Sequence, residues 1–325
     1  MGKNSIAATK SYRSINTFKQ YWTLDSTDYW HLQYPLNSKW EEYYWDMSEK
    51  AFQCKLPRDE NGITTYFGED GNTYYSSIEL AQYAMASYQA FLKTNDEYWL
   101  NESILHIDYF ISLAESYKGA DYTILNHYPI SLYEIDHPWP TSLGFGVAVS
   151  LMVRLHKLTN SQTYLDNARK LIKNFYLNVE NGGILREVDV NKKEKLLLLE
   201  EYPTNNLSGV LNGHIFGLWG LYDLGTIDEE VNNYFRELSI NLTRNLSIWD
   251  GGFWSLYDAR HLDGETMNYA SVHYHMLHVR MILILYRITG AKEYANFAEK
   301  LIKQKHGVKS RLKALTLKVF YRLKI

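Results

Sequence analysis

Residues 158–172 read LTNSQTYLDNARKLI, and residues 288–302 read ITGAKEYANFAEKLI. Each stretch has a short Thr-Asn or Thr-Gly turn, followed by apolar residues at three- and four-residue spacing, as in an amphipathic helix. The stretches match at Thr159/Thr289, Tyr164/Tyr294, Ala168/Ala298, Lys170/Lys300, Leu171/Leu301 and Ile172/Ile302. Because a helical hairpin cannot bury its apolar face alone, a repeated one predicts a fold in which several hairpins stack.

The same helical spacing continues along most of the chain on both sides of the repeat. It predicts eight helices in four pairs: Ile78–Leu92, Tyr98–Leu113, Leu143–Leu158, Tyr164–Tyr176, Val210–Leu224, Glu229–Leu246, Ser271–Ile288 and Lys292–Lys303. Fully apolar stretches such as Met281–Leu285 are typical of inner helices that are covered on all sides. We therefore predict a mainly α fold, an α/α toroid of about four helical hairpins, with an open α-solenoid as the alternative.

Glycine pairs interrupt the helical pattern at Asn181-Gly182-Gly183 and at Asp250-Gly251-Gly252. Each pair is predicted to open a β-hairpin insert, and strand-like runs follow at Lys195–Leu199 and Phe253–Tyr257. Helical spacing is absent before Ser76. We therefore divide the chain into residues 1–75, an N-terminal arm (1–30) and a short β-rich segment; residues 76–304, the toroid; and residues 305–325, a basic tail.

Composition indicates a globular protein and excludes several other classes. The 325 residues are 46% hydrophobic, which is enough for a sizeable core. The net charge of −3 gives no signal of nucleic-acid binding. The single cysteine, Cys54, cannot form a disulfide within the chain, and the N-terminus has no apolar run of the length of a signal peptide or membrane span. We expect a cytoplasmic protein.

The end of the chain combines basic and apolar residues and carries no acidic residue after Glu299. The basic residues are Lys303, Lys305, Lys309, Arg311, Lys313, Lys318, Arg322 and Lys324. Such a basic amphipathic segment can lie on an anionic membrane, which would make the protein peripheral at the inner membrane face. Binding of an acidic polysaccharide and docking on the toroid are the two alternatives.

Residues that can carry chemistry gather in two stretches. The first is Gly252–Arg280, GFWSLYDARHLDGETMNYASVHYHMLHVR, in which tyrosine, arginine and histidine meet at a predicted strand end and helix start. Catalytic side chains are often held at such element ends. The second stretch begins with Glu200-Glu201-Tyr202-Pro203 and leads into the glycine-interrupted helix predicted from Gly209 to Leu224.

Four motifs in these stretches resemble those of the glucuronyl C5-epimerases in the same order. They are EEYP at 200–203, VLNG…GLYDL at 210–224, SLYDARH at 255–261, and Tyr269 with His273 four residues later. Those enzymes convert D-glucuronate to L-iduronate within heparosan and heparan-type chains. The resemblance is strongest from Glu200 to Leu285 and continues more weakly through Ser76–Tyr88 and Pro138–Ser150.

Epimerisation at carbon-5 removes a proton beside a carboxylate and replaces it from the other face, so it needs two proton-transfer groups and a positive group on the carboxylate. The resemblance implies that Glu201 and Tyr269 are the proton-transfer pair and that Arg260 binds the carboxylate. It also makes Tyr202 and Tyr257 candidate catalytic residues. A cation can lower the pKa of a tyrosine, and Arg260 follows Tyr257 by three residues.

We predict that His261, His273 and Asn212, which lie in the same motifs, bind substrate, and that Trp139 in its Pro-Trp-Pro setting is a sugar platform. Each candidate also has a structural alternative: core packing for Tyr257 and Trp139, pairing with Asp258 or Glu200 for Arg260, capping or pairing for Glu201, and a helix hydrogen bond for His273. The segment Met267–Ala270 departs from the family's Trp-Asp-Tyr-His, so the surroundings of Tyr269 are expected to differ.

No metal or cofactor is expected. His273 and His275 are two residues apart on a predicted helix and do not face each other, while His275 and His278 lack a third ligand in the sequence. No phosphate-binding glycine loop is present, which argues against a nucleotide cofactor. We therefore predict a polysaccharide-level glucuronyl 5-epimerase whose partner is an acidic, uronate-containing polysaccharide; a homodimer is compatible with this prediction. The alternatives are a uronate polysaccharide lyase, a glycoside hydrolase and a non-catalytic glycan-binding protein.

Overall fold

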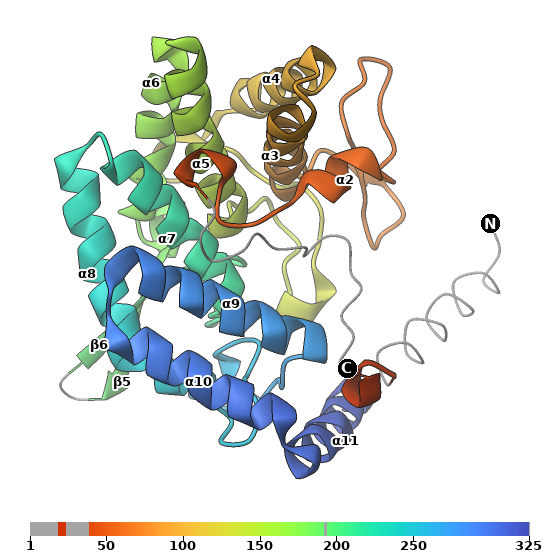
Figure 1. Cartoon of the computed structure of the whole chain (residues 1–325), viewed down its shortest axis with the longest axis vertical. Helices are drawn as coiled ribbons and strands as arrows, with labels where there is room; N and C mark the ends of the chain where they lie inside the picture. Colours follow the sequence, from red (N-terminus) through yellow and green to blue (C-terminus); the bar gives the residue numbers. More distant parts are fainter. Residues whose placement is uncertain (1–18, 24–38, 192–193, 325) are drawn as a thin grey trace. The chain divides into compact units, whose positions relative to one another are not determined.

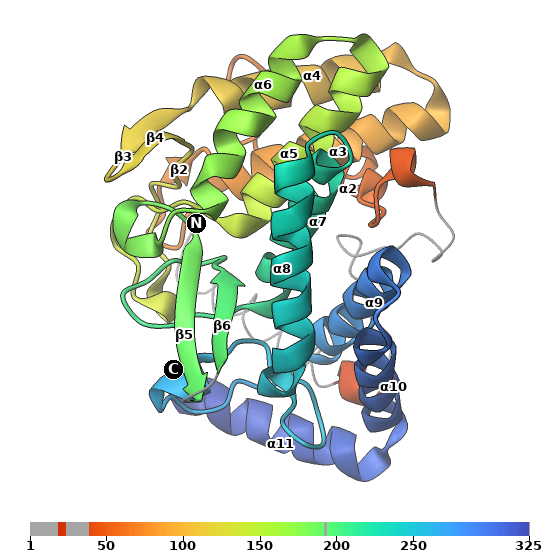
Figure 2. The ribbon, with the colours of Figure 1, turned by 90° about the vertical axis from the view of Figure 1, so that its left-hand side faces the viewer.

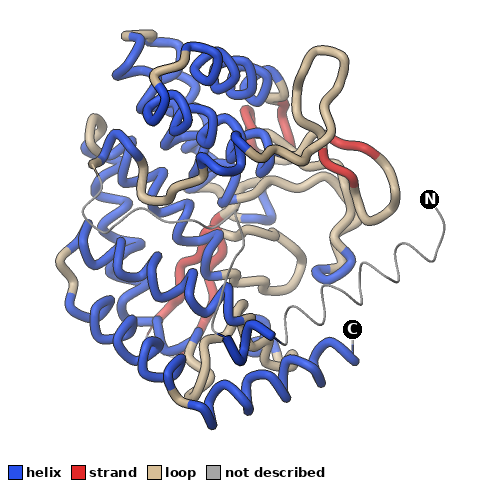
Figure 3. Tube along the Cα trace, turned by 45° about the vertical axis from the view of Figure 1, so that its right-hand side comes forward, coloured by secondary structure: helices blue, strands red, loops and turns tan. Residues whose placement is uncertain are grey.

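The computed structural model describes residues 19–23, 39–191 and 194–324 (Figure 1). Helices predominate, as the secondary-structure colouring of Figure 3 shows. The chain forms two compact units: a central unit, Tyr29–Asn245, and a terminal unit, Met1–Asp28 together with Leu246–Ile325. In the part of the chain that is described, no helix is both long and apolar enough to cross a membrane.

The eight predicted helices are confirmed, and in the described residues they form four consecutive hairpins. These are α3 (Ser77–Thr94) with α4 (Glu97–Ser112), α5 (Ser142–Thr159) with α6 (Gln162–Leu171), α7 (Leu211–Gly225) with α8 (Glu229–Asn245), and α9 (Val272–Thr289) with α10 (Lys292–His306). The first three belong to the central unit and the fourth to the terminal unit. This is the mainly helical architecture of an α/α toroid, as predicted.

A threonine builds the turn of three of these hairpins. The hydroxyls of Thr94, Thr159 and Thr289 each donate to the carbonyl four residues earlier, at 2.8, 2.7 and 2.7 Å. The next residue is left-handed in each case, with φ of 56° at Asn95, 57° at Asn160 and 72° at Gly290. Because such a turn requires a residue that tolerates positive φ, Asn and Gly are interchangeable there.

Helices α5 and α7 are buried along most of their length and approach each other closely. A Cβ atom added at Gly146 would lie 2.1 Å from the carbonyl oxygen of Phe216, and one at Gly220 would lie 2.8 Å from the Cα of Gly146. Only glycine allows two helix backbones to come this near. The glycines in these apolar helices therefore set how the inner layer of the central unit packs.

A buried ion pair ties the start of the central unit to the same two helices. Arg154 Nη1 of α5 lies 2.6 Å from Asp223 Oδ2 of α7, and neither side chain is exposed. Asp223 also accepts hydrogen bonds from Trp40 Nε1 at 2.8 Å and from the Tyr44 hydroxyl at 2.5 Å. A buried pair is stabilised when its remaining polar atoms are hydrogen-bonded, and these aromatic donors satisfy the second carboxylate oxygen of Asp223.

The first predicted insert is a β-hairpin of β5 (Leu185–Asn191) and β6 (Glu194–Leu199). It lies beside α8, as Figure 2 shows. The side chain of Asn241 in α8 accepts from Leu197 N at 2.9 Å and donates to Lys195 O at 2.7 Å. The side chain of Asn241 therefore satisfies two backbone groups on the outer edge of β6, where no further strand of the described residues pairs with it.

The second predicted insert contains no strand, so the strand expected at Phe253–Tyr257 is wrong. Only single bridges form, at Asp250↔Ser255 and Leu256↔Tyr269. The amide of Gly251 donates to Trp254 O at 2.9 Å, which closes a tight turn. Trp254 is fully buried, and its Nε1 donates to Ala270 O at 2.9 Å. An aromatic side chain anchored in the core thus replaces the regular ladder.

Residues 39–75 contain η2 (Trp40–Glu42), α2 (Ser48–Phe52) and a two-residue pair of strands, β1 (Tyr66–Phe67) and β2 (Thr73–Tyr74). This segment is therefore mostly irregular. The predicted arm, residues 1–30, lies largely outside the described residues. The remaining elements are β3 (Glu115–Tyr117), β4 (Ala120–Thr123), and the 3-10 turns η3 (Ser131–Tyr133), η4 (Ile172–Phe175), η5 (Val179–Asn181), η6 (Leu246–Trp249) and η7 (Arg260–Asp263).

The basic tail forms a helix, α11 (Val308–Lys324). One of its faces packs on its own unit, where Ala314 is fully buried in a cluster with Trp254, Leu256 and Tyr269. The opposite face leaves Val308, Leu312 and Phe320 exposed. Docking on its own unit, one of the three predicted alternatives, is therefore observed for one face of the tail.

The close approach of α5 and α7 generates a stability prediction. Gly146→Ala places a methyl group against backbone that cannot move aside, and overpacking of this kind costs about 1–3 kcal/mol or more. Urea denaturation should show that loss in the free energy of unfolding. The control Gly290→Asn fills open space at a left-handed position that Asn occupies in the equivalent turns, so it should change stability little. Wild-type stability in Gly146→Ala would contradict this account.

Candidate active site

Two adjacent glutamates follow β6, and their surroundings differ. The carboxylate of Glu200 accepts from Arg186 Nε at 2.7 Å, from Ser208 N at 3.2 Å and from Gly209 N at 2.9 Å, with a further short bond from the Ser208 hydroxyl. It is fully buried and its charge is matched by Arg186. Glu200 therefore anchors the loop that leads from β6 to α7.

Glu201 is buried without a cationic partner in any ion pair of the described residues. Its Oε2 accepts from Asn212 Nδ2 at 2.9 Å. Burial raises the pKa of Glu201 to about 7, and this effect exceeds the lowering by hydrogen bonds from Tyr202 and Asn212. A carboxyl group that titrates near neutral pH can both accept and return a proton, which is what general acid–base catalysis requires.

Gly213, at the start of α7, makes room for Glu201. A Cβ atom added there would lie 2.4 Å from the Cβ of Glu201 and 2.6 Å from its Oε2. The carboxyl group is therefore pressed against the helix backbone, and no larger residue fits beneath it. This close approach explains why Glu201 is so thoroughly shielded from water.

Aromatic rings surround Tyr202. It stacks on Tyr133, with ring centroids 4.4 Å apart and planes 16° apart, and lies 5.5 Å from the ring of Trp139. Trp139 is fully buried and its Nε1 donates to Tyr128 O at 2.9 Å. The sugar-platform interpretation of Trp139 is therefore wrong, because no ring face is exposed. Tyr202 is the partly exposed member of this group.

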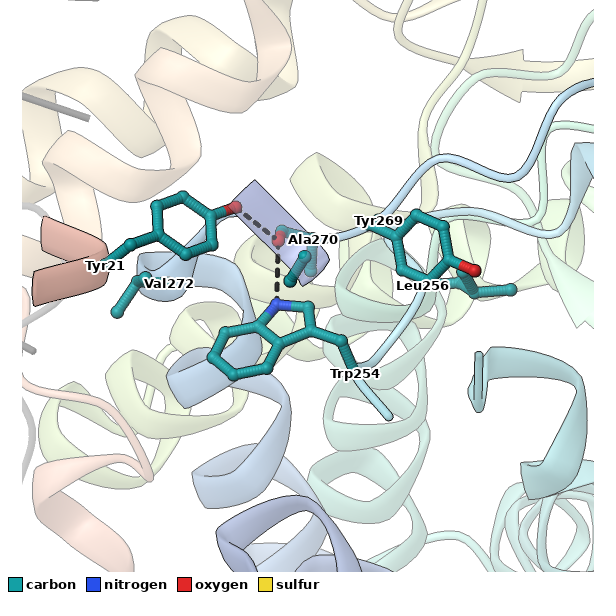
Figure 4. Packing of buried hydrophobic residues seen from close by; sticks show 7 residues of the cluster. Tyr21, Trp254, Leu256, Tyr269, Ala270 and Val272 are labelled. Carbon is teal, nitrogen blue, oxygen red and sulfur yellow. Dashed lines mark hydrogen bonds between the residues drawn. The ribbon is translucent and has the colours of Figure 1, made fainter. Parts of the chain in front are cut away.

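Tyr269, in the terminal unit, is held by its neighbours on both sides. Its ring stacks on Phe253 at 4.9 Å, and a Cβ atom at Gly251 would come within 2.5 Å of it. The next carbonyl, Ala270 O, accepts from Trp254 Nε1 at 2.9 Å and from the Tyr21 hydroxyl at 3.2 Å (Figure 4). Burial raises the pKa of Tyr269, so at neutral pH its hydroxyl is protonated and can donate.

The predicted departure around Tyr269 has a visible consequence. The Tyr269 hydroxyl lies 3.6 Å from the sulfur of Met267, where the family has tryptophan. A thioether is a weak acceptor, so it leaves the hydroxyl proton available to a stronger one.

Arg260 is engaged by protein groups on two sides. Its Nε donates to Asp258 Oδ2 at 3.2 Å, and its Nη2 donates to the hydroxyl of Tyr321 in α11. The alternative of a pair with Asp258 is therefore observed, whereas Glu200 pairs with Arg186. Tyr257 is partly buried with its ring edge-on to Tyr274 at 4.7 Å. His261 is half-buried, and burial lowers its pKa.

The histidines of α9 belong to the core. His273 is mostly buried and lies edge-on to Tyr274 at 5.4 Å. His275 Nδ1 accepts from Ser255 N at 3.2 Å, so Nε2 is the protonated nitrogen that donates to Leu301 O at 2.9 Å. Burial lowers the pKa of His275 to about 4 and that of His278 to about 3. Within the described residues no three metal-ligating side chains gather into a site.

The structure thus brings the predicted residues together in two groups. The glutamate group comprises Glu201, Tyr202, Asn212 and Trp139 in the central unit, and the tyrosine–arginine group comprises Tyr257, Arg260, His261, Tyr269 and His273 in the terminal unit. Tyr133, Lys318 and Tyr321 were missed because they lie outside the motifs. The role of Gly213 could have been predicted from the sequence, because a glycine inside a helical pattern signals a close approach of another part of the chain.

The environment of Glu201 predicts an unusual response of stability to pH. Its folded-state pKa is raised from 4.5 to about 7, so its stabilising contribution is present below pH 4.5 and is lost as pH rises through 7. Glu201→Gln removes the buried charge and should raise the free energy of unfolding at pH 8 by up to about 3 kcal/mol, with a smaller gain at pH 5.

Denaturant titrations at both pH values measure this difference. Glu200→Gln is the matched control on the neighbouring residue. It removes a charge that Arg186 and the Ser208 hydroxyl stabilise, so it should lower stability at pH 8. If Glu201→Gln were less stable than wild type at pH 8, the assigned pKa of Glu201 would be in error.

Comparisons with known proteins address the identity of this chain. The family model described as D-glucuronyl C5-epimerase C-terminus matches residues 115–303. A D-glucuronyl C5-epimerase of Caenorhabditis elegans is 37% identical over 90 residues, which are 28% of this chain and 14% of that protein. An uncharacterized protein of Methanocaldococcus jannaschii is 26% identical over 213 residues, 63% of this chain and 67% of the relative.

Among solved structures, the cellobiose 2-epimerase of Bacillus thermoamylovorans has a similar fold, with a TM-score of 0.54 and 11% identity over 89% of this chain and 86% of that one. This likeness concerns the fold, an α/α toroid. The match to the family model covers more than half of the chain and includes all four motifs. The chain belongs to the D-glucuronyl C5-epimerase family, a family of carbohydrate epimerases, and its residues 115–303 match the family's C-terminal part.

Proposed function

We propose that this protein converts D-glucuronate to L-iduronate residues at carbon-5 within an acidic polysaccharide of the heparosan type. The observation that carries the proposal is Glu201, a buried carboxyl group in the EEYP motif whose pKa is raised to about 7. A structural glutamate is normally paired or exposed, as Glu200 is paired. A buried carboxyl group that has a near-neutral pKa and no cation in the ion pairs of the described residues is instead typical of an acid–base residue.

In the proposed reaction the C5–H bond breaks and Glu201 accepts the proton. The electron pair passes into the substrate carboxylate, which becomes enolate-like, and Arg260 stabilises the charge on its oxygens. The hydroxyl of Tyr269 then donates a proton to the opposite face of carbon-5, and exchange with solvent restores both groups. The reverse reaction uses the same two groups with their roles exchanged.

Two other functions are compatible with the same residues. A uronate lyase would begin with the same proton abstraction but would then expel the group at carbon-4, leaving an unsaturated product that absorbs in the ultraviolet. A non-catalytic glycan-binding protein would bind the polysaccharide without exchanging hydrogen at carbon-5. The raised pKa of Glu201 favours an enzyme, since a binding protein has no need of a titrating buried carboxyl group.

Proton transfer is tested by incubating heparosan in deuterated water and following carbon-5 by NMR. We expect the wild type to incorporate deuterium, and Glu201→Gln and Tyr269→Phe each to lower the rate by about 100-fold or more, since each removes one acid–base group. Asp70→Ala, in an exposed turn, is the control and should react like wild type. Wild-type exchange in Tyr269→Phe would remove that residue from the mechanism, and absence of exchange in the wild type would reject the function.

We also propose that the exposed face of α11 rests on an anionic membrane surface. Val308, Leu312 and Phe320 are exposed on a helix that bears several cations and no acid. Replacing all three by serine should weaken co-sedimentation with phosphatidylglycerol vesicles about tenfold, because apolar insertion is lost. Leu158→Ser, at an exposed leucine of α5, is the matched control. Equal sedimentation of the triple variant and wild type would refute this contact.

A further inference from the structure

Helix α11 makes specific polar contacts with the segment that carries Arg260. The Tyr321 hydroxyl accepts a hydrogen bond from Arg260 Nη2, and Lys318 Nζ donates to Asn268 Oδ1 at 2.7 Å. Both residues of α11 lie beyond residue 303, where the match to the family model ends. These contacts therefore extend the tyrosine–arginine group with residues that the family motifs do not contain.

Asn268 links the two cations through one buried carboxylate. Its Nδ2 donates to Asp258 Oδ2 at 2.7 Å while its Oδ1 accepts from Lys318, and Asp258 Oδ2 also accepts from Arg260. An amide suits this position because it can donate on one side and accept on the other. An aspartate at 268 would instead set a second carboxylate against Asp258.

The charges of this network do not balance. Arg260 and Lys318 each carry a positive charge and Arg322 adds a third at the surface, whereas Asp258 and the exposed Glu265, which both act on Tyr321, supply two negative charges. Asp258 and Asn268 are buried, while Arg260 and Lys318 are partly exposed. Two partly exposed cations over one buried carboxylate leave an excess of positive charge that an anion can neutralise.

We propose that α11 completes an anion-binding site in which Lys318 and Arg260 together bind a substrate carboxylate and Tyr321 positions the guanidinium of Arg260. The site rests on the proposed function for the identity of its ligand, a uronate residue. Arg260 supplies the planar fork that matches a carboxylate, and Lys318 supplies a compact charge that can approach from a second side. Tyr321 accepts from Arg260, and its ring lies 5.2 Å from Lys318 Nζ, so it contacts both cations and is a positioning residue.

Binding in such a site is linked to pH. Burial lowers the pKa of Lys318 to about 8, and Arg322 from the same helix and Arg260 from η7 lower it further, while Asp258 opposes them. A bound carboxylate favours the charged form of Lys318 and raises its pKa. The protein should therefore take up protons on binding near pH 8, and its affinity should fall as pH rises above 8.

Isothermal titration calorimetry of the full chain with a heparosan octasaccharide tests the site. The control ligand is the same octasaccharide with its carboxylates reduced to alcohols. At pH 7, Lys318→Met should weaken octasaccharide binding about tenfold, through loss of a charge-assisted contact. Lys318→Arg should bind within about twofold of wild type at pH 7 and should keep its affinity at pH 9, where wild type loses it, since arginine stays charged.

Lys309→Met is the matched control, because it removes one exposed charge from the same helix, and it should bind like wild type. Titration of wild type at pH 8 in two buffers of different ionisation enthalpy should reveal proton uptake, which Lys318→Arg should lack. Because Lys318→Arg leaves Glu201 intact, this comparison separates the two titrating groups.

The role of Tyr321 is tested by a double-mutant cycle on the exchange rate at carbon-5. Arg260→Lys should lower the rate about tenfold, since it loses the fork. Tyr321→Phe should lower the rate in the wild-type background and have little effect in the Arg260→Lys background, which a merely structural tyrosine would not produce.

Wild-type affinity in a folded Lys318→Met would overturn the site. So would an equal loss of affinity for the reduced octasaccharide, which would show that Lys318 only supports the fold. If the wild type binds the octasaccharide through Lys318 but exchanges no hydrogen at carbon-5, the anion site stands and the proposed epimerase function fails. The two proposals are thereby distinguishable.

Discussion

The close packing of α7 against its neighbours is the constraint on which the central unit depends. Gly213, Gly217 and Gly220 are spaced by four and three residues, so they share one face of the helix. Added Cβ atoms would lie 2.4 Å from Glu201 Cβ, 2.7 Å from Leu199 Cδ1 and 2.8 Å from Gly146 Cα, respectively. One glycine face therefore receives the end of β6, the candidate acid–base residue and the backbone of α5. The shielding that shifts the pKa of Glu201 follows from helix packing.

Neighbouring residues of the same type have opposite roles because their partners differ. Glu200 and Glu201 are both buried, but among the ion pairs of the described residues only Glu200 has a cation, Arg186, and burial raises the pKa of Glu201 to about 7. In the terminal unit the cations are in excess, and burial lowers the pKa of Lys318. Within each unit, therefore, the charged partners and the burial of an ionisable side chain decide how readily it exchanges a proton.

In the terminal unit, an aromatic core instead of a β-sheet supports the segment that carries Tyr269. Trp254 stacks on His275 at 3.8 Å, and its indole N–H and the Tyr21 hydroxyl both donate to Ala270 O. The carbonyl that follows Tyr269 is thereby fixed without a strand ladder. Packing and hydrogen bonds of aromatic side chains thus fix the backbone beside Tyr269, the proposed proton donor, in a segment that forms no strand.

The sequence alone determined the eight helices, the β5–β6 hairpin and the motif residues, because helical periodicity, turn chemistry and short motifs are local properties of the chain. The same information left Glu201 open between pairing and catalysis and Trp139 open between a sugar platform and core packing, and it predicted a strand at Phe253–Tyr257. Only the tertiary structure decided that Arg186 binds Glu200, that Trp139 is buried, and that Tyr321 reaches Arg260 from 61 residues away. The reason is physical: burial and the choice of partner arise from the packing of segments distant in sequence, which no local pattern encodes.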